Sequence, residues 1–167
     1  WGLGYPGSEG DPLNQGFDRF FGYNCQRYAH RYYPEYLWDD SEKVYLEGND
    51  WTRTETYAPD LIQEHTIDFI RKNKDTAFFA FVPIVIPHAE LIVPDDEIFR
   101  KYLGAYPETP YAGRPGADYG PDMKISMYCS QDNPRATFAA MVHRLDAYVG
   151  EIVRVLNELG LSENTLI

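Results

Sequence analysis

The sequence has few cysteines, few basic residues and no long hydrophobic run, and each shortage excludes a class of protein. Its two cysteines, Cys25 and Cys129, do not occur in a metal-binding spacing such as C-x-x-C. With 15 Lys and Arg against 26 Asp and Glu, the net charge of -11 argues against binding to a nucleic-acid backbone. No apolar run approaches the roughly 20 residues that a membrane helix needs. We therefore expect no nucleic-acid partner and no membrane span.

Both ends of the chain also lack features of a complete domain. The first residue is Trp1 rather than methionine, and no signal peptide is visible after it. The last residues, Thr165-Leu166-Ile167, are typical of the first residues of a buried strand. We interpret the chain as a segment whose nearest partner is the rest of the same polypeptide. Its cellular compartment stays open on these grounds.

Aromatic residues, in contrast, are abundant, with 14 Tyr, 9 Phe and 3 Trp. Tyrosine and tryptophan combine an apolar body with a polar tip and are favoured in wet interfaces and ligand pockets. In residues 25–38, Gln26 and His30 are interleaved with tyrosines. These side chains could line a pocket for a polar ring such as a sugar, or anchor a loop through hydrogen bonds. The pattern leaves both readings open.

Helical periodicity is clear in two segments, 57–74 and 134–159. Proline and aspartate occupy the first turn of the earlier segment, and Gly160 follows the later one at the position that ends many helices. Apolar residues of the later segment form one continuous stripe, which comprises Phe138, Met141, Val142, Leu145, Val149, Ile152, Val153, Leu156 and Leu159. We expect both segments to be amphipathic helices.

The remaining segments carry weaker signals. A short β-hairpin is predicted around Gly48-Asn49, and a short helix is predicted from Pro94 to Tyr102. Prolines and glycines punctuate an irregular stretch within residues 92–133. A loop of that length is usually functional or partly mobile, although a plain insertion is an alternative.

The stretch from Phe78 to Leu91 indicates the fold class. It begins as an apolar run without polar alternation, which is typical of a strand buried on both faces. Because a helix precedes this strand, the order is half of a βαβ unit. We therefore predict an α/β fold with a mostly parallel sheet, flanking helices and long irregular loops.

The predicted strand ends at Pro87-His88. In open α/β sheets, ligands bind beyond the carboxyl ends of the strands. The imidazole of His88 is thus a candidate functional group. The alternative is that His88 only forms the tip of a turn between two prolines.

Several motifs, in order along the whole chain, resemble the sulfatase family of the alkaline-phosphatase-like superfamily. Residues 1–4, W-G-L-G, are similar to the end of the family's G-K-W-x-L-G signature, and residues 16–23 are similar to its G-F-D-x-F-x-G-Y segment. Pro87-His88 matches the P-H pair that follows a buried strand in these enzymes. Residues 145–167 resemble the run that leads into the family's metal-binding S-D-N-G.

This resemblance implies hydrolysis of a sulfate ester, on a sulfated small molecule or a glycan. The family uses a formylglycine made from a C/S-x-P/A-x-R motif and a divalent cation, usually calcium. His88 matches the residue that contacts the sulfate and acts as a general acid. The resemblance also implies a periplasmic or secreted enzyme.

The departures from the family pattern are equally informative. Cys25 and Cys129 are followed by Gln-Arg-Tyr and Ser-Gln-Asp, so neither fits the formylglycine motif. The family's paired metal-binding aspartates are absent, and we expect no metal ligand in this chain. Residues 1–167 are therefore predicted to be an internal fragment of the catalytic domain that is inactive alone.

A further departure concerns Gly2, because many members carry a histidine at that position. His30 and Gln26 are our candidates for the missing contact or for substrate recognition, with local hydrogen bonding in a loop as the alternative. Two other functions stay open. One is a phosphate or phosphonate ester hydrolase of the same superfamily, and the other is a non-catalytic carbohydrate-binding module.

Overall fold

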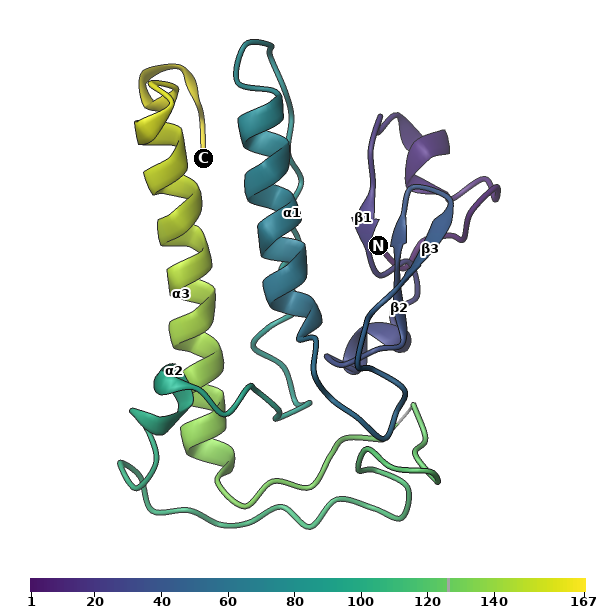
Figure 1. Ribbon diagram of the computed structural model, residues 1–167, viewed down its shortest axis with the longest axis vertical. Coiled ribbons are helices and arrows are strands. Elements are labelled where there is room, and N and C mark those ends of the chain that lie inside the picture. The colour runs from purple at the N-terminus through teal and green to yellow at the C-terminus, as the bar shows by residue number, and fades with distance from the viewer. Residues whose placement is uncertain (126) are drawn as a thin grey trace.

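A computed structural model describes residues 1–125 and 127–167 of the chain. Helices α1 and α3 lie side by side, and the small sheet lies on the other side of α1 (Figure 1). A long irregular segment crosses the foot of both layers and leads into α3 (Figure 1). In chain order the strands and α-helices are β1 (Phe21–Gly22), β2 (Tyr36–Asp39), β3 (Glu42–Tyr45), α1 (Ala58–Lys72), α2 (Glu97–Arg100) and α3 (Pro134–Glu158).

Helix α1 confirms the helix predicted over 57–74. Pro59 and Asp60 lie in its first turn. The N–H that proline lacks would have no partner within the helix there, and the carboxylate is attracted to the positive end of the helix dipole. Its buried face includes Ile67 and Ile70, which pack against Val155 and neighbouring residues of α3. This contact makes α1 and α3 one layer.

Helix α3 confirms the second predicted helix and its end. Gly160 has a φ of 71°, and its N–H donates to Asn157 while Leu161 donates to Leu156 at 2.9 Å. These two bonds satisfy carbonyls that the helix leaves free at its end. No helix in the described residues is long and apolar enough to cross a membrane.

The buried face of α3, however, differs from the predicted stripe. Four apolar residues of that stripe are exposed, namely Phe138, Val142, Val149 and Val153. Met141 and Leu156 of the stripe are buried as predicted, whereas Arg144 and Tyr148, which lie outside it, are buried as well. These two polar side chains can be buried because Asp60 of α1 and Asp96, just before α2, accept their hydrogen bonds.

The sheet is antiparallel, in the order β1-β2-β3. Its hairpin turns at Asp40-Ser41, so the hairpin predicted around Gly48-Asn49 was misplaced. Asp40 has a φ of 52°, a conformation that aspartate tolerates better than most residues. At the predicted position, the buried Asn49 side chain instead bonds Pro34, Glu55 and Thr56 and holds a loop closed.

The apolar run after α1 is extended but unpaired. No strand of the described residues lies beside residues 77–86, and Phe79 and Phe81 are 75% and 57% exposed. The strand predicted to be buried on both faces is therefore not formed here, because a strand needs neighbours for its N–H and C=O groups. The expected parallel sheet is likewise not seen in the described residues. Leu166, predicted to start another buried strand, is fully exposed.

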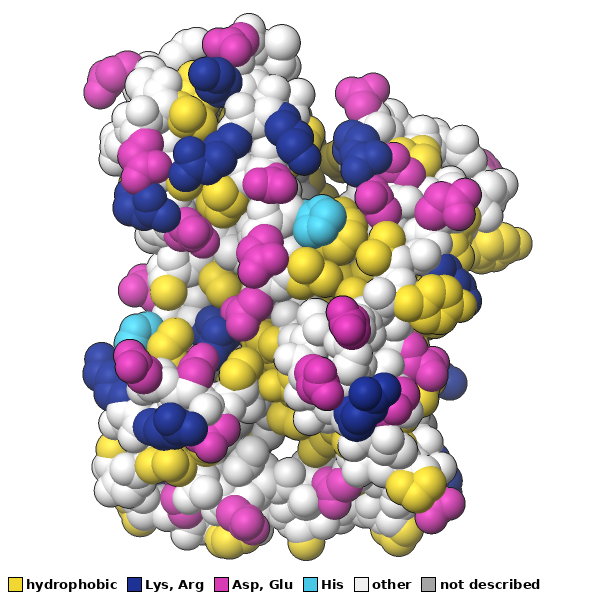
Figure 2. Space-filling model, viewed as in Figure 1, with side chains coloured by type: hydrophobic (Ala, Val, Ile, Leu, Met, Phe, Trp, Pro, Cys, Tyr) yellow, Lys and Arg dark blue, Asp and Glu magenta, His cyan; other side chains and the backbone are white. Residues whose placement is uncertain are grey.

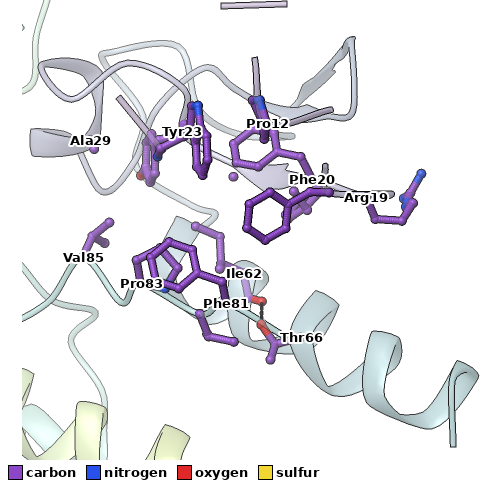
Figure 3. Close-up of a pocket in the computed structure, with 15 residues that line it drawn as sticks. Pro12, Arg19, Phe20, Tyr23, Ala29, Ile62, Thr66, Phe81, Pro83 and Val85 are labelled. Atoms are coloured by element: carbon purple, nitrogen blue, oxygen red, sulfur yellow. Dashed lines mark hydrogen bonds between the residues drawn. The ribbon is translucent and has the colours of Figure 1, made fainter. Parts of the chain in front are cut away.

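Side-chain packing holds this extended segment in place. Phe78 meets Phe69 of α1 edge-on with 5.6 Å between ring centroids, and Ile86 is buried in the core beside Tyr32. Hydrophobic side chains gather between α1 and the sheet (Figure 2). Phe20 faces Ile62 and Phe81 across an apolar hollow of about 150 Å³ (Figure 3). No histidine lines this hollow, so it is separate from the predicted site.

A buried guanidinium connects all three helices. Arg144 of α3 donates to both carboxylate oxygens of Asp60 in α1, at 2.9 and 3.0 Å. It also donates to Asp96, whose side chain accepts from two N–H groups at the start of α2. Tyr148 donates to Asp60 from the next turn of α3. We name Arg144, Asp60, Asp96 and Tyr148 the helix network.

We expect Arg144→Met to lower the free energy of unfolding by about 2 to 3 kcal/mol, because two carboxylates lose their shared cation. The figure lies below that for fully buried pairs, since both aspartate side chains are 38% exposed. Urea denaturation measures the loss. Arg100→Met removes the exposed pair with Asp95 and should leave stability unchanged. Equal midpoints for the Arg144 variant and the parent chain would contradict this account.

Candidate functional site

Three rings from distant parts of the chain meet at one place on the surface. The ring centroids of His30 and His88 are 4.9 Å apart, and Tyr128 lies 5.5 Å from His30 and 5.8 Å from His88. His88 is exposed, whereas His30 and Tyr128 are partly buried. We name these three residues the ring cluster. It brings together two of the site residues predicted from sequence.

Each ring comes from an irregular segment. His30 ends a short 3-10 turn, Tyr28–His30, which is held by the bond from Arg31 N–H to Tyr28 C=O at 3.0 Å. His88 follows the extended run, and Tyr128 lies in the long segment before α3. The sequence left that long segment open between a functional or mobile loop and a plain insertion, and it had no signal to select Tyr128 among 14 tyrosines.

The surroundings of His30 favour its neutral form. Burial lowers the pKa of His30 below its ordinary value of 6.5, and the neighbouring His88 and Arg31 lower the pKa further. The neutral imidazole of His30 is therefore favoured near pH 7. A neutral ring carries one N–H donor and one acceptor nitrogen, so His30 can bind a hydroxyl or an anionic oxygen.

Gln26, the third predicted residue, lies outside the ring cluster. Its side chain is exposed, and no hydrogen bond joins it to either histidine in the described part of the chain. It does lie beside Gly2, where an added Cβ would sit 3.5 Å from the Cβ of Gln26. Gln26 therefore occupies the space next to the position where many family members carry a histidine.

A buried ion pair lies beneath the ring cluster. Arg31 Nη1 donates to Glu90 Oε1 at 2.9 Å and to Cys129 Sγ at 3.0 Å, and both charged side chains are fully buried. Glu90 Oε2 accepts from the backbone N–H of Cys129 at 3.0 Å. Arg31 Nη2 donates to the carbonyl of Lys124 at 2.7 Å. We name Arg31, Glu90 and Cys129 the buried network.

Burial also sets the protonation of this network. Desolvation raises the pKa of Glu90, while Arg31 and hydrogen bonds from Cys129 act in the opposite direction. The thiol of Cys129 has a strongly raised pKa because it is buried beside the Glu90 carboxylate. Cys129 thus stays a protonated donor to Glu90 Oε1 at 3.1 Å. Cys25 is exposed and the two cysteines do not pair.

The residues present do not fit the cofactors that the resemblance implies. Across residues 1–125 and 127–167, no group of three or more His, Cys, Asp or Glu side chains is arranged to hold a metal ion. Calcium needs six to eight oxygen ligands, which the ring cluster does not offer. Neither cysteine stands in the formylglycine motif. What the cluster offers is proton transfer and hydrogen bonding.

A comparison with protein families agrees with the motifs and their order. The family model described as Sulfatase matches residues 1–167, which is every residue of the chain. The match includes the turn that carries His30 and the segment that carries His88. At the level of the family it supports sulfuric ester hydrolase activity. The chain belongs to the sulfatase family.

Proposed function

We propose that the protein hydrolyses sulfate esters and that His88 contacts the sulfate and protonates the leaving oxygen. The observation that carries this proposal is the convergence of His88, His30 and Tyr128 in a chain whose whole length matches the sulfatase family. An imidazole changes charge near neutral pH, so it can donate a proton and recover it in each turnover. The exposure of His88 leaves it open to a substrate.

His30 and Gln26 are assigned to substrate binding. His30 is favoured neutral, so it contributes a hydrogen bond without adding a second positive charge beside His88. Gln26 offers an amide donor and acceptor next to Gly2. Hydroxyl-rich substrates suit such groups, and Tyr45 is an exposed aromatic in the neighbouring hairpin. We therefore favour a sulfated glycan over a simple aryl ester.

The nucleophile and the metal site are assigned to other parts of the polypeptide. Phe79, Phe81 and four apolar residues of α3 are exposed, and further parts of a larger domain would cover them. We infer that residues 1–167 are an internal part of a larger catalytic domain and that residues 77–86 pair with strands of its parallel sheet. Formylglycine and calcium would be provided there, in a periplasmic or secreted enzyme.

Replacement of His88 by alanine in the full-length enzyme should lower kcat for an aryl sulfate by about two to four orders of magnitude, the usual scale for an acid-base group. His143→Ala is the matched control, because His143 bonds Tyr102 on the surface of α3. The control should keep parental kinetics. A His88→Ala enzyme with unchanged kcat would show that His88 has only a structural role, in the turn that follows residues 77–86.

The purified 167-residue chain should not turn over an aryl sulfate, since neither the formylglycine motif nor a metal-binding cluster occurs in the residues described. A spectrophotometric assay with 4-nitrophenyl sulfate and added calcium measures this, with the full-length enzyme as the positive control. Sustained turnover by the chain alone would mean that the nucleophile has been assigned to the wrong part of the protein.

The pKa of His30 should lie below 6.5 and should rise in His88→Ala, because that change removes a neighbouring charge and admits water. Since folding lowers this pKa, the unfolded chain binds the proton more tightly. His30 therefore makes the free energy of unfolding depend on pH. The fold has its full stability above about pH 6.5 and loses part of it as the pH falls below 6.5 and His30 becomes protonated. NMR titration of the histidine rings tests the shift. His65→Ala is the control and should leave the pKa of His30 unchanged, since His65 stacks on Phe21 instead. A lower pKa of His30 in His88→Ala would contradict the assignment.

A further inference from the structure

We propose that the buried network of Arg31, Glu90 and Cys129 positions the ring cluster for catalysis, with Glu90 acting through His88. This proposal rests on the proposed function, because it assigns a task to residues beneath the same site. None of the three side chains is placed to touch a substrate, since all three are buried. They are positioning residues rather than catalytic ones.

The first argument is the place of each residue in the sequence. Arg31 directly follows His30, and Cys129 directly follows Tyr128. Glu90 lies two residues after His88. The bonds of the network therefore connect the three segments that carry the rings, over separations of 59 and 39 residues. The network therefore restrains the backbone next to each of the three rings.

The second argument is the geometry at the Glu90 carboxylate. Oε1 accepts from Arg31 and from the Cys129 thiol, while Oε2 accepts from the backbone N–H of Cys129. The carboxylate thus holds the main chain next to Tyr128 as well as a side chain. Arg31 is held in turn at its backbone, whose carbonyl accepts from the hydroxyl of Tyr23 at 2.8 Å. These contacts leave the three segments little freedom to shift relative to one another.

The third argument is energetic. A fully buried ion pair gives up so much hydration that well-packed apolar residues often stabilise a fold equally well. The Nε of Arg31 adds to this cost, because it is buried without a hydrogen-bond partner in the described residues. If the ion pair adds little net stability, its presence is better explained by the positions in which it holds its three chain segments. Catalytic groups must be held within about 0.5 Å of the productive position.

The matched comparison is the helix network, which is also built on a buried guanidinium. Arg144 binds two carboxylates, Asp60 of α1 and Asp96 at the N-cap of α2, and in the described part of the chain neither is bonded to the ring cluster. Asp60→Asn and Glu90→Gln are equivalent changes, since each replaces a carboxylate that accepts from arginine with an amide of the same shape. Any loss of activity through general destabilisation should appear in both variants.

The experiment uses the full-length enzyme with Glu90→Gln, His88→Ala, the double variant and Asp60→Asn. We expect Glu90→Gln to lower kcat for an aryl sulfate about 10- to 100-fold with KM changed less than threefold, because a misplacement near 1 Å has effects of that size. The double variant should be no slower than His88→Ala, since Glu90 acts through His88. Asp60→Asn should also lower Tm, because it weakens the helix network, and should retain parental kcat.

Additive losses in the double variant, or parental kcat in Glu90→Gln, would overturn the positioning role while leaving the proposed function intact. Full activity of His88→Ala would overturn the proposed function, and the positioning role with it. If Glu90→Gln does not fold, Cys129→Ser replaces it, because serine keeps the backbone N–H and a shorter hydroxyl donor. That variant should show a kcat loss of about threefold to tenfold, again absent on the His88→Ala background. An additive loss there would also refute the positioning role.

Discussion

The ion pair between Arg31 and Glu90 is the interaction on which the candidate site depends. Its two residues lie 59 positions apart and both side chains are fully buried. In the described residues, 1–125 and 127–167, the segments that carry His30, His88 and Tyr128 have no strand ladder between them and belong to no α-helix. Backbone hydrogen bonding between secondary-structure elements therefore does not set the distances between these rings. Side-chain bonds that converge on one carboxylate do so instead.

The parts of the fold that sequence could predict are those specified locally. A helix is encoded by residues within a few turns of one another, so periodicity, a first-turn proline and Gly160 were sufficient for α1 and α3. The buried face of α3 was not predictable in this way, because Arg144 is buried only through carboxylates supplied by Asp60 and Asp96. The hairpin was misplaced for a related reason. Its turn uses Asp40 in a left-handed conformation, while the more typical Gly48-Asn49 pair serves a loop closed by the Asn49 side chain.

The sequence singled out His88 and His30 as candidates, but neither Tyr128 nor the arrangement of the three rings was predictable from it. His88 stood out because it ends an apolar run, and His30 because it lies among tyrosines. Their approach to 4.9 Å depends on charged residues that composition would assign to the surface. Arg31 and Glu90 carry no local sign of burial, and Cys129 differs little from any lone cysteine. A sequence without aligned relatives offers no way to pair residues so far apart.

The extended segment 77–86 shows how the site can be ordered although the predicted sheet is not formed around it. Its outer residues Phe79 and Phe81 are exposed, yet its end is anchored, since Ile86 is buried in the core and Glu90 lies in the buried network. His88 lies between Ile86 and Glu90 in the sequence, so core packing on one side and the ion pair on the other fix its position. Pairing of the segment with further strands would cover its apolar side chains and satisfy its backbone. It would not be needed to bring His88 to His30, because the contacts that do so are already complete within this chain.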